Sequence, residues 1–336
     1  MQTLNNLKLP IIAAPMFLAS GPELVIECCK AGIVGTFPAL NQRTSEEFES
    51  WLVQIKQALH SEAEQKASTG KAHQDLPAPY GVNLVVHKSN PRAAQDLELC
   101  VRHEVPLVIT SLGAAKEVVD AVHSYGGLVF HDAVNARYAK KAADAGVDGI
   151  ICVSSGAGGH AGAINPFALL AEVRAVFNGT LLLGGCLSTG QDVAAAQMMG
   201  ADLAYMGTRF INTHESLVDD AYRDMIIRSK AEDIIYTPKV SGVPASFMRE
   251  SMIAAGLDPN DKRPKEVIDY GTDLSVDAPE DAKQDQSKEK KKGAWADIWS
   301  AGQGVASISD VVTVKKLVDR LEREYRAAVD RFQSLQ

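Results

Sequence analysis

The residue with the clearest capacity for chemistry is His160, which stands in the segment SSGAGGHAG (154–162). Nearly all of its neighbours are Gly, Ala or Ser, so the chain leaves room on both sides of the imidazole. An imidazole with a pKa of about 6.5 can remove a proton, or stabilise an oxyanion when it is itself charged. Gly156, Gly158 and Gly159 would let the backbone approach a planar cofactor. The alternative is a flexible turn with a surface histidine.

Two further segments that contain glycine could bind a phosphate. They are LLLGG (181–185) and MGTRF (206–210). Small residues allow backbone N–H groups to converge on an anion, so Gly185, Gly207 and Thr208 could donate to one phosphate, with the Thr208 hydroxyl adding a further bond. The alternative is two tight turns in which glycine serves only the backbone conformation.

The composition favours an enzyme of small molecules. The chain has 336 residues, of which 46% are hydrophobic and 23% charged, and its net charge is -8. This net charge gives no electrostatic indication of binding to nucleic acid or to an anionic membrane, and a local basic patch is the alternative. The apolar stretch 9–19 is too short to cross a bilayer and is a poor match to a secretion signal, so we expect a cytoplasmic protein. The five cysteines have no C-x-x-C spacing, which predicts buried free thiols and no metal site.

The chain alternates short apolar runs with longer stretches of helical period, which is typical of βα units around a parallel sheet. Eight strands with intervening helices predict a (β/α)8 TIM barrel, whose active site lies at the carboxyl ends of the strands. A doubly wound sheet is the alternative. The expected strands span residues 10–16, 32–38, 80–86, 106–111, 127–133, 149–155, 180–186 and 201–207.

The rhythm of strands and helices stops after the eighth strand. We expect residues 1–212 and 294–336 to form the barrel, and residues 213–293 to form a helical insertion, or lid, that ends in a charged linker (277–293). Phe247 and Met248 could line a pocket or pack the core of the insertion. The segment 310–332 has apolar residues at helical spacing and is expected to close the barrel wall as an amphipathic helix.

Read together, the motifs resemble the FMN-dependent nitronate monooxygenase family. They occur in order as AAPM (13–16), GVNL (81–84), AGGHAG (157–162), LLGG (182–185), MGTRF (206–210) and IWSAGQGV (298–305). The resemblance implies a barrel with non-covalent FMN, and a catalytic role for His160 beside the flavin. It also implies a cofactor site formed by Ala14, Pro15, Met16, Asn83, Ser154, Gly158, Gly159, Gly184, Gly185, Met206, Gly207, Thr208, Ser300, Gly302 and Gln303.

Within that site, the resemblance places the flavin ring near residues 14–16 and Asn83, and the phosphate on Gly185, Gly207 and Thr208. Relatives that resemble quinone reductases tend to carry a lysine where Asp132 stands, so cofactor electrostatics or acceptor choice could differ here. An acid near the flavin would disfavour negative charge on the reduced ring. Asp132 could instead cap a helix or make a hydrogen bond within the barrel mouth.

The implied reaction is the oxidation of alkyl nitronates by FMN and O2 to carbonyl compounds and nitrite. One alternative is an NAD(P)H-dependent flavin reductase of quinones or enoyl-thioesters, since relatives with the same histidine motif have these activities. Another is a flavin-binding barrel with no turnover. The sequence leaves open whether the chain forms a homo-oligomer.

Overall fold

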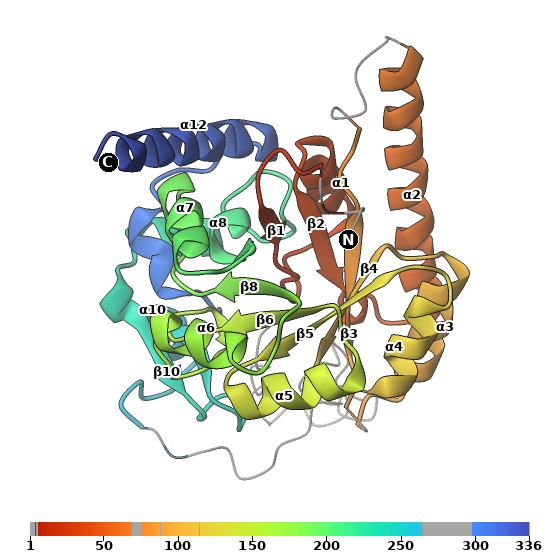
Figure 1. Ribbon diagram of the computed structural model, residues 1–336. Helices are drawn as coiled ribbons and strands as arrows, with labels where there is room; N and C mark the ends of the chain where they lie inside the picture. Colours follow the sequence, from red (N-terminus) through yellow and green to blue (C-terminus); the bar gives the residue numbers. More distant parts are fainter. Residues whose placement is uncertain are drawn as a thin grey trace.

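The computed structural model describes residues 4, 6–68, 76–87, 89–113, 115–261, 263 and 298–335. Eight parallel strands form a closed barrel with helices around it (Figure 1), which confirms the expected fold. Every barrel strand lies within its expected range and is shorter than that range. The barrel strands are β1 (Ile11–Ala13), β2 (Val34–Pro38), β3 (Tyr80–Val85), β4 (Leu107–Ser111), β5 (Leu128–Ala133), β6 (Gly149–Val153), β8 (Thr180–Gly184) and β9 (Leu203–Met206).

Closure of the barrel depends on the pairing of its first and last strands. β1 pairs with β9 in parallel, with Ala13 opposite Met206, and this pair brings the two strand ends side by side. The barrel interior is packed with apolar side chains, among them Ile12, Phe130 and Ile151. The floor beneath the strand ends is therefore a solid core.

Helices on the outside of the barrel begin and end at residues that the sequence marks. α5 is capped by Asn135, whose side chain accepts a hydrogen bond from the Tyr138 backbone, and it ends at Gly146 with φ of 91°. The wall and surrounding helices are α1 (Pro22–Lys30), α2 (Ser45–Ser68), α3 (Ala93–Arg102), α4 (Lys116–His123), α5 (Ala136–Ala145), α6 (Pro166–Arg174), α7 (Gly190–Met198), α8 (Thr208–Ile211) and α12 (Val314–Gln333), with a short 3-10 helix, η2 (Ala39–Asn41).

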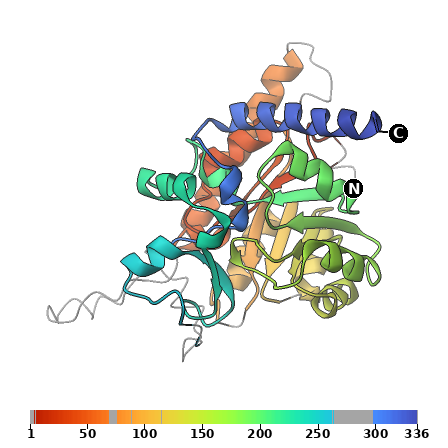
Figure 2. The same ribbon diagram turned by 90° about the vertical axis from the view of Figure 1, so that its left-hand side faces the viewer.

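The chain after β9 contains strands that the sequence analysis did not predict. Besides helices α9 (Asp220–Arg228) and α10 (Arg249–Ala254) and the 3-10 turn η4 (Ala231–Asp233), it forms β10 (Ile234–Thr237) and β11 (Ala245–Met248). These strands are too short to give a recognisable period, because each has four residues. The segment lies to one side of the barrel, in teal and cyan on the left of Figure 2. The charged run 277–293 lies outside the described residues.

A third short strand connects this segment to the barrel. β7 (Gly159–His160) pairs with β11 in an antiparallel sheet of order β10-β11-β7. Phe247 and Met248 of β11 are fully buried among apolar neighbours. Of the two expectations for these residues, the structure therefore has the one in which they pack a core. The chain then returns through the 3-10 helix η6 (Gln303–Ser307) to α12.

The terminal helix α12 closes the barrel wall, as expected. It packs beside α7 (Figure 1), and its buried face carries Leu317, which lies in one apolar cluster with Val193 and Phe210. The opposite face is charged and exposed, which is the pattern of an amphipathic helix on a surface.

This packing predicts the effect of shortening Leu317, which is fully buried. We expect Leu317→Ala to lower the free energy of unfolding by about 2–5 kcal/mol, because it removes buried methyl groups and leaves a cavity between α12 and α7. Urea denaturation followed by circular dichroism measures this change. Arg331→Ala, on the exposed end of the same helix, is the control and should alter stability by less than about 0.5 kcal/mol. Equal stabilities of the two variants would contradict the packing described.

Candidate functional site

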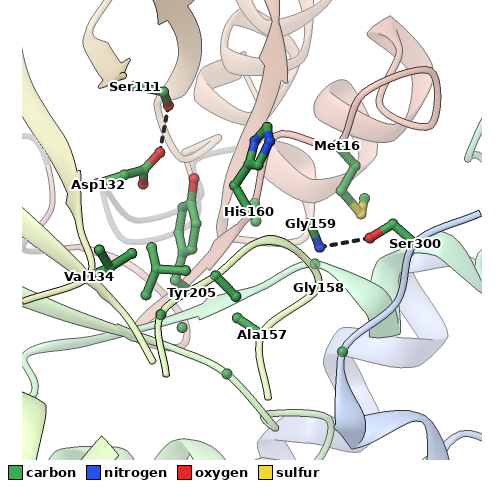
Figure 3. Close-up of a pocket in the computed structure, with 18 of the residues that line it drawn as sticks. Met16, Ser111, Asp132, Val134, Ala157, Gly158, Gly159, His160, Tyr205 and Ser300 are labelled. Carbon is green, nitrogen blue, oxygen red and sulfur yellow. Dashed lines mark hydrogen bonds between the residues drawn. The ribbon is translucent and has the colours of Figure 1, made fainter. Parts of the chain in front are cut away.

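A cavity of about 880 Å3 opens at the carboxyl ends of the barrel strands (Figure 3). Its size is in the range of pockets that hold a cofactor or a drug-sized ligand. Most residues that the sequence analysis selected line this cavity, although they come from distant parts of the chain. They are Ala14, Pro15, Met16, Asn83, Gly158, Gly159, His160, Gly184, Gly185, Gly207, Thr208, Ser300 and Gly302.

Three selected residues lie outside the cavity lining. Ser154 is fully buried, and its hydroxyl donates to the Gly184 carbonyl at 2.8 Å. Met206 is buried in the apolar cluster shared with α7 and α12, and its carbonyl accepts a hydrogen bond from the Ala14 backbone at 2.9 Å. The backbone N–H of Gln303 donates to the Gly156 carbonyl at 2.8 Å. These three residues hold the loops of the site in place.

The glycines around His160 serve a purpose that differs in part from the expected one. A Cβ on Gly158 would lie 2.9 Å from the Gly302 nitrogen, and one on Gly302 would lie 2.7 Å from the Gly156 carbonyl oxygen. The missing side chains therefore make room for another stretch of backbone, residues 301–303. Gly159 has open space around its Cβ position but a φ of 68°, which favours glycine for conformation.

The expected phosphate site is formed by the ends of β8 and β9. Gly185 has a φ of 131°, and a Cβ there would meet the Ser154 hydroxyl at 2.4 Å, so only glycine fits. Next to it, the Thr208 hydroxyl oxygen accepts a hydrogen bond from the Gly302 backbone at 2.9 Å. A hydroxyl that accepts still has its proton to donate, so Thr208 can bond an anionic oxygen.

His160 is placed over the cavity by strand β7. Its backbone lies opposite Ala245 of β11, and its half-buried side chain reaches the cavity (Figure 3). The Nε2 atom lies 3.5 Å from the hydroxyl of Ser241, which donates its own proton to the Val243 carbonyl at 2.9 Å. The contact between His160 and Ser241 is at the long end of the range for a hydrogen bond.

Both neighbours of His160 are held by side chains from later segments. The Gly159 backbone N–H donates to the Ser300 hydroxyl at 2.7 Å (Figure 3), and the Tyr236 hydroxyl donates to the Ala161 carbonyl at 3.0 Å. The short strand is thus fixed on each side of the imidazole. Tyr236 was not selected from the sequence, because nothing local to it indicates a partner so far away in the chain.

A chain of hydrogen bonds crosses three neighbouring strand ends on the other side of the cavity. The Asn83 amide donates to the Ser111 hydroxyl at 2.7 Å and to the Ile109 carbonyl at 3.2 Å. Ser111 in turn donates to Asp132 Oδ2 at 2.5 Å. Asp132 does not cap α5, since Asn135 does. The expected alternative, a hydrogen bond within the barrel mouth, is what the structure has.

Burial controls the ionisation of this side of the cavity. Burial raises the pKa of Asp132 to about 6 against the opposing hydrogen bond from Ser111, and its Oδ1 atom has no hydrogen-bond partner within the described structure. Burial also raises the pKa of Tyr205, with a further contribution from Asp132, and lowers that of His131 to about 4. Tyr205 and Ser111 occupy predicted strand ends, and this position was the signal that could have identified them.

The structure corrects the expectation for one cysteine. Cys28, Cys29, Cys100 and Cys152 are buried free thiols, as expected, whereas Cys186 is exposed and lines the cavity just after Gly185. Partial burial of the Cys186 thiol raises its pKa, so the thiolate is disfavoured. Among the residues that the structure describes, no cluster of His, Cys, Asp and Glu side chains could hold a metal ion.

The environment of Asp132 predicts a dependence of stability on pH. Because its folded pKa of about 6 exceeds the ordinary value of 3.8, folding favours the protonated acid, and the wild-type protein loses this advantage as the pH rises from about 4 through 6. We expect the free energy of unfolding of Asp132→Asn, relative to that of the wild type, to rise by about 1–3 kcal/mol as the pH increases across this range. Above this range the difference should stay nearly constant. Chemical denaturation without added ligand measures the difference, with Asp144→Asn as an exposed control. A difference that is constant with pH would contradict the burial argument.

Comparison with known proteins gives several matches of low identity but wide coverage. A nitronate monooxygenase of Paraburkholderia phytofirmans is 27% identical, over 96% of this chain and 93% of the relative. The (3aS,4S,5R,7aS)-5-hydroxy-7a-methyl-1-oxo-octahydro-1H-indene-4-carboxyl-CoA dehydrogenase of Rhodococcus jostii is also 27% identical, over 73% of this chain, which spans only 64% of the length of that relative. The solved structure of a nitroalkane oxidase from Streptomyces ansochromogenes has the same fold, with a TM-score of 0.76, 21% identity, and coverage of 99% of this chain and 100% of that one.

No helix within the described ranges is long and apolar enough to cross a membrane.

The family model described as nitronate monooxygenase matches residues 1–324. A match over nearly the whole chain shows that this protein belongs to the nitronate monooxygenase family, and so that it is a flavin-dependent oxidoreductase.

Proposed function

We propose that this protein binds FMN and oxidises alkyl nitronates with O2 to carbonyl compounds and nitrite. The observation that carries the proposal is the position of His160, an imidazole at the mouth of a cavity of about 880 Å3, opposite strand ends lined by small residues. FMN supplies the two-electron acceptor when it is bound. The residues of the chain must then orient the cofactor, hold the nitronate and control protons.

The residues present fit FMN at both ends of the molecule. The Asn83 amide nitrogen donates its two protons to the Ile109 carbonyl and the Ser111 hydroxyl. The group that Asn83 can offer to a ligand is therefore its Oδ1, which is an acceptor. An acceptor at this point suits the ring N–H of a flavin. Thr208 has the opposite character, because its hydroxyl retains a proton for a phosphate oxygen. Ala14, Pro15 and Met16 add an apolar surface between the two ends.

His160 would act on the substrate in one of two protonation states. A nitronate already carries the negative charge that the reaction needs, so the protonated imidazole would bind its oxygens and stabilise their charge. With a neutral nitroalkane, the unprotonated imidazole would remove the α-proton. Residues of the insertion that line the cavity, including Tyr222, Tyr236 and Pro244, would cover the substrate, which is the reason to propose that the insertion is a lid.

An NAD(P)H-dependent flavin reductase of quinones or enoyl-thioesters is the second candidate. The Rhodococcus jostii relative, which by its name is a dehydrogenase of a carboxyl-CoA compound, supports this candidate. The apolar lining and the volume of the cavity would also accept a substrate larger than a simple nitronate. The two candidates differ in what donates electrons to the flavin, and they share the fold and the histidine.

The role of His160 predicts the result of its replacement. We expect His160→Asn to lower kcat for an alkyl nitronate by about 100-fold or more, because the group that stabilises the charge of the nitronate is lost, while FMN stays bound. Oxygen consumption measures turnover, and absorbance measures the flavin content. His60→Asn, on the exposed surface of α2, is the matched control and should retain wild-type rates. Wild-type turnover by His160→Asn would exclude the proposed role.

The role of Thr208 predicts a change in cofactor affinity. Thr208→Val should weaken FMN binding by about 10- to 100-fold, because a hydrogen bond to a charged oxygen is worth about 1.5–3 kcal/mol. Thr208→Ser keeps the hydroxyl and should bind nearly as the wild type does. Quenching of FMN fluorescence by the apoprotein gives the dissociation constants. If the valine and serine variants bind FMN equally well, the hydroxyl is not a phosphate ligand.

A further inference from the structure

The hydroxyl of Ser300 lies between two strands of the sheet that carries His160. It accepts a hydrogen bond from the Gly159 backbone at 2.7 Å and donates to the Ser246 carbonyl at 2.6 Å. Gly159 and Ser246 are opposite each other in the register of β7 and β11. The hydroxyl therefore joins the two strands at the residue before His160 and ties both of them to the segment that leads into η6.

A count of protons distinguishes the hydroxyl of Ser300 from that of Thr208. A serine hydroxyl has one proton, and that of Ser300 goes to the Ser246 carbonyl. It has none left to donate to a phosphate oxygen, although the residue lines the cavity. Thr208 differs because its hydroxyl is an acceptor in the protein and keeps its proton.

We infer that Ser300 is a positioning residue for His160 and does not bind the cofactor phosphate, an inference that rests on the proposed function of His160. Its hydroxyl fixes Gly159, which has a φ of 68° and, as a glycine, little restriction of its own on the backbone just before the imidazole. On the other side of the imidazole, Tyr236 holds Ala161. The Ser300 hydroxyl and Tyr236 thus hold the residues on either side of His160.

Tyr222 keeps Ser300 in position. Its phenol oxygen accepts a hydrogen bond from the Ser300 backbone N–H at 3.1 Å, and its proton is donated to the Ser300 carbonyl. The Tyr222 ring stacks on Trp299, with centroids 4.8 Å apart and planes 7° from parallel. Tyr222 thus holds both peptide groups of Ser300. The Ser300 hydroxyl in turn holds the strand that carries His160.

The test compares Ser300→Ala with Ser300→Thr, which keeps the hydroxyl. For Ser300→Ala we expect kcat with propyl-2-nitronate to fall about 10- to 100-fold at saturating FMN, and the dissociation constant of FMN to stay within about threefold of the wild type. Hydrogen exchange of the segment around residue 159 should become faster, because its N–H loses a partner. Ser300→Thr should restore both turnover and protection.

Two results would overturn the inference. If Ser300→Ala weakens FMN binding as much as Thr208→Val does, with turnover unchanged once FMN saturates, then Ser300 is a cofactor ligand. If turnover, FMN affinity and exchange all remain at wild-type values, then the hydroxyl positions nothing. A wild-type protein that does not oxidise nitronates would refute the proposed function instead, and the exchange and FMN measurements would still decide the role of Ser300.

Tyr222→Phe is the second variant, and it serves if Ser300→Ala fails to fold. It keeps the stack on Trp299 and the Ser300 hydroxyl, and it removes only the phenol bonds to the Ser300 backbone. We expect a smaller fall in kcat, of about 3- to 10-fold, with FMN affinity unchanged and faster exchange around residue 159. Unchanged kcat and exchange in this variant would contradict the proposed coupling.

Discussion

The pairing of β7 with β11 is the interaction on which the site depends. His160 does not stand on a barrel strand, since β6 ends at Val153 and the chain then passes through a glycine-rich loop. Its position comes from a sheet that is completed only when β11, in the segment after β9, pairs with β7. The barrel provides the floor of the cavity, and the segment after β9 fixes the strand that carries the histidine.

Close contact between backbones is the second constraint, and it explains the composition of the loops. Residues 156–158 and 301–303 pass each other so closely that a Cβ on Gly158 or Gly302 would collide with the facing backbone, and the Gln303 backbone N–H donates to the Gly156 carbonyl. The glycines around His160 thus join the loop to the returning chain. The same contact places the Thr208 hydroxyl against Gly302, which links the proposed phosphate ligand Thr208 to the segment that holds the histidine.

The sequence allowed prediction of the barrel because its signals are local. Eight apolar runs, helix stops such as Gly146 and the amphipathic pattern of α12 each depend on neighbouring residues, and each strand formed within its expected range. The sheet of β10, β11 and β7 could not be predicted, because four-residue strands have no period and their pairing joins distant parts of the chain. The hydrogen bonds of Ser300, Tyr222 and Asp132 are likewise contacts between remote residues. The motifs selected Ser300, which lines the cavity, but only the geometry shows where its proton is used.

The most direct test of this account is the visible spectrum of the purified protein under anaerobic conditions, before and after addition of propyl-2-nitronate, with NADH and NADPH added to separate samples. The proposed reaction predicts a flavin spectrum that bleaches with the nitronate, persists with either nicotinamide, and returns when air is admitted. Bleaching by a nicotinamide, with no response to the nitronate, would contradict the proposed reaction and favour the reductase. The absence of a flavin band even after addition of FMN would contradict the cofactor site itself.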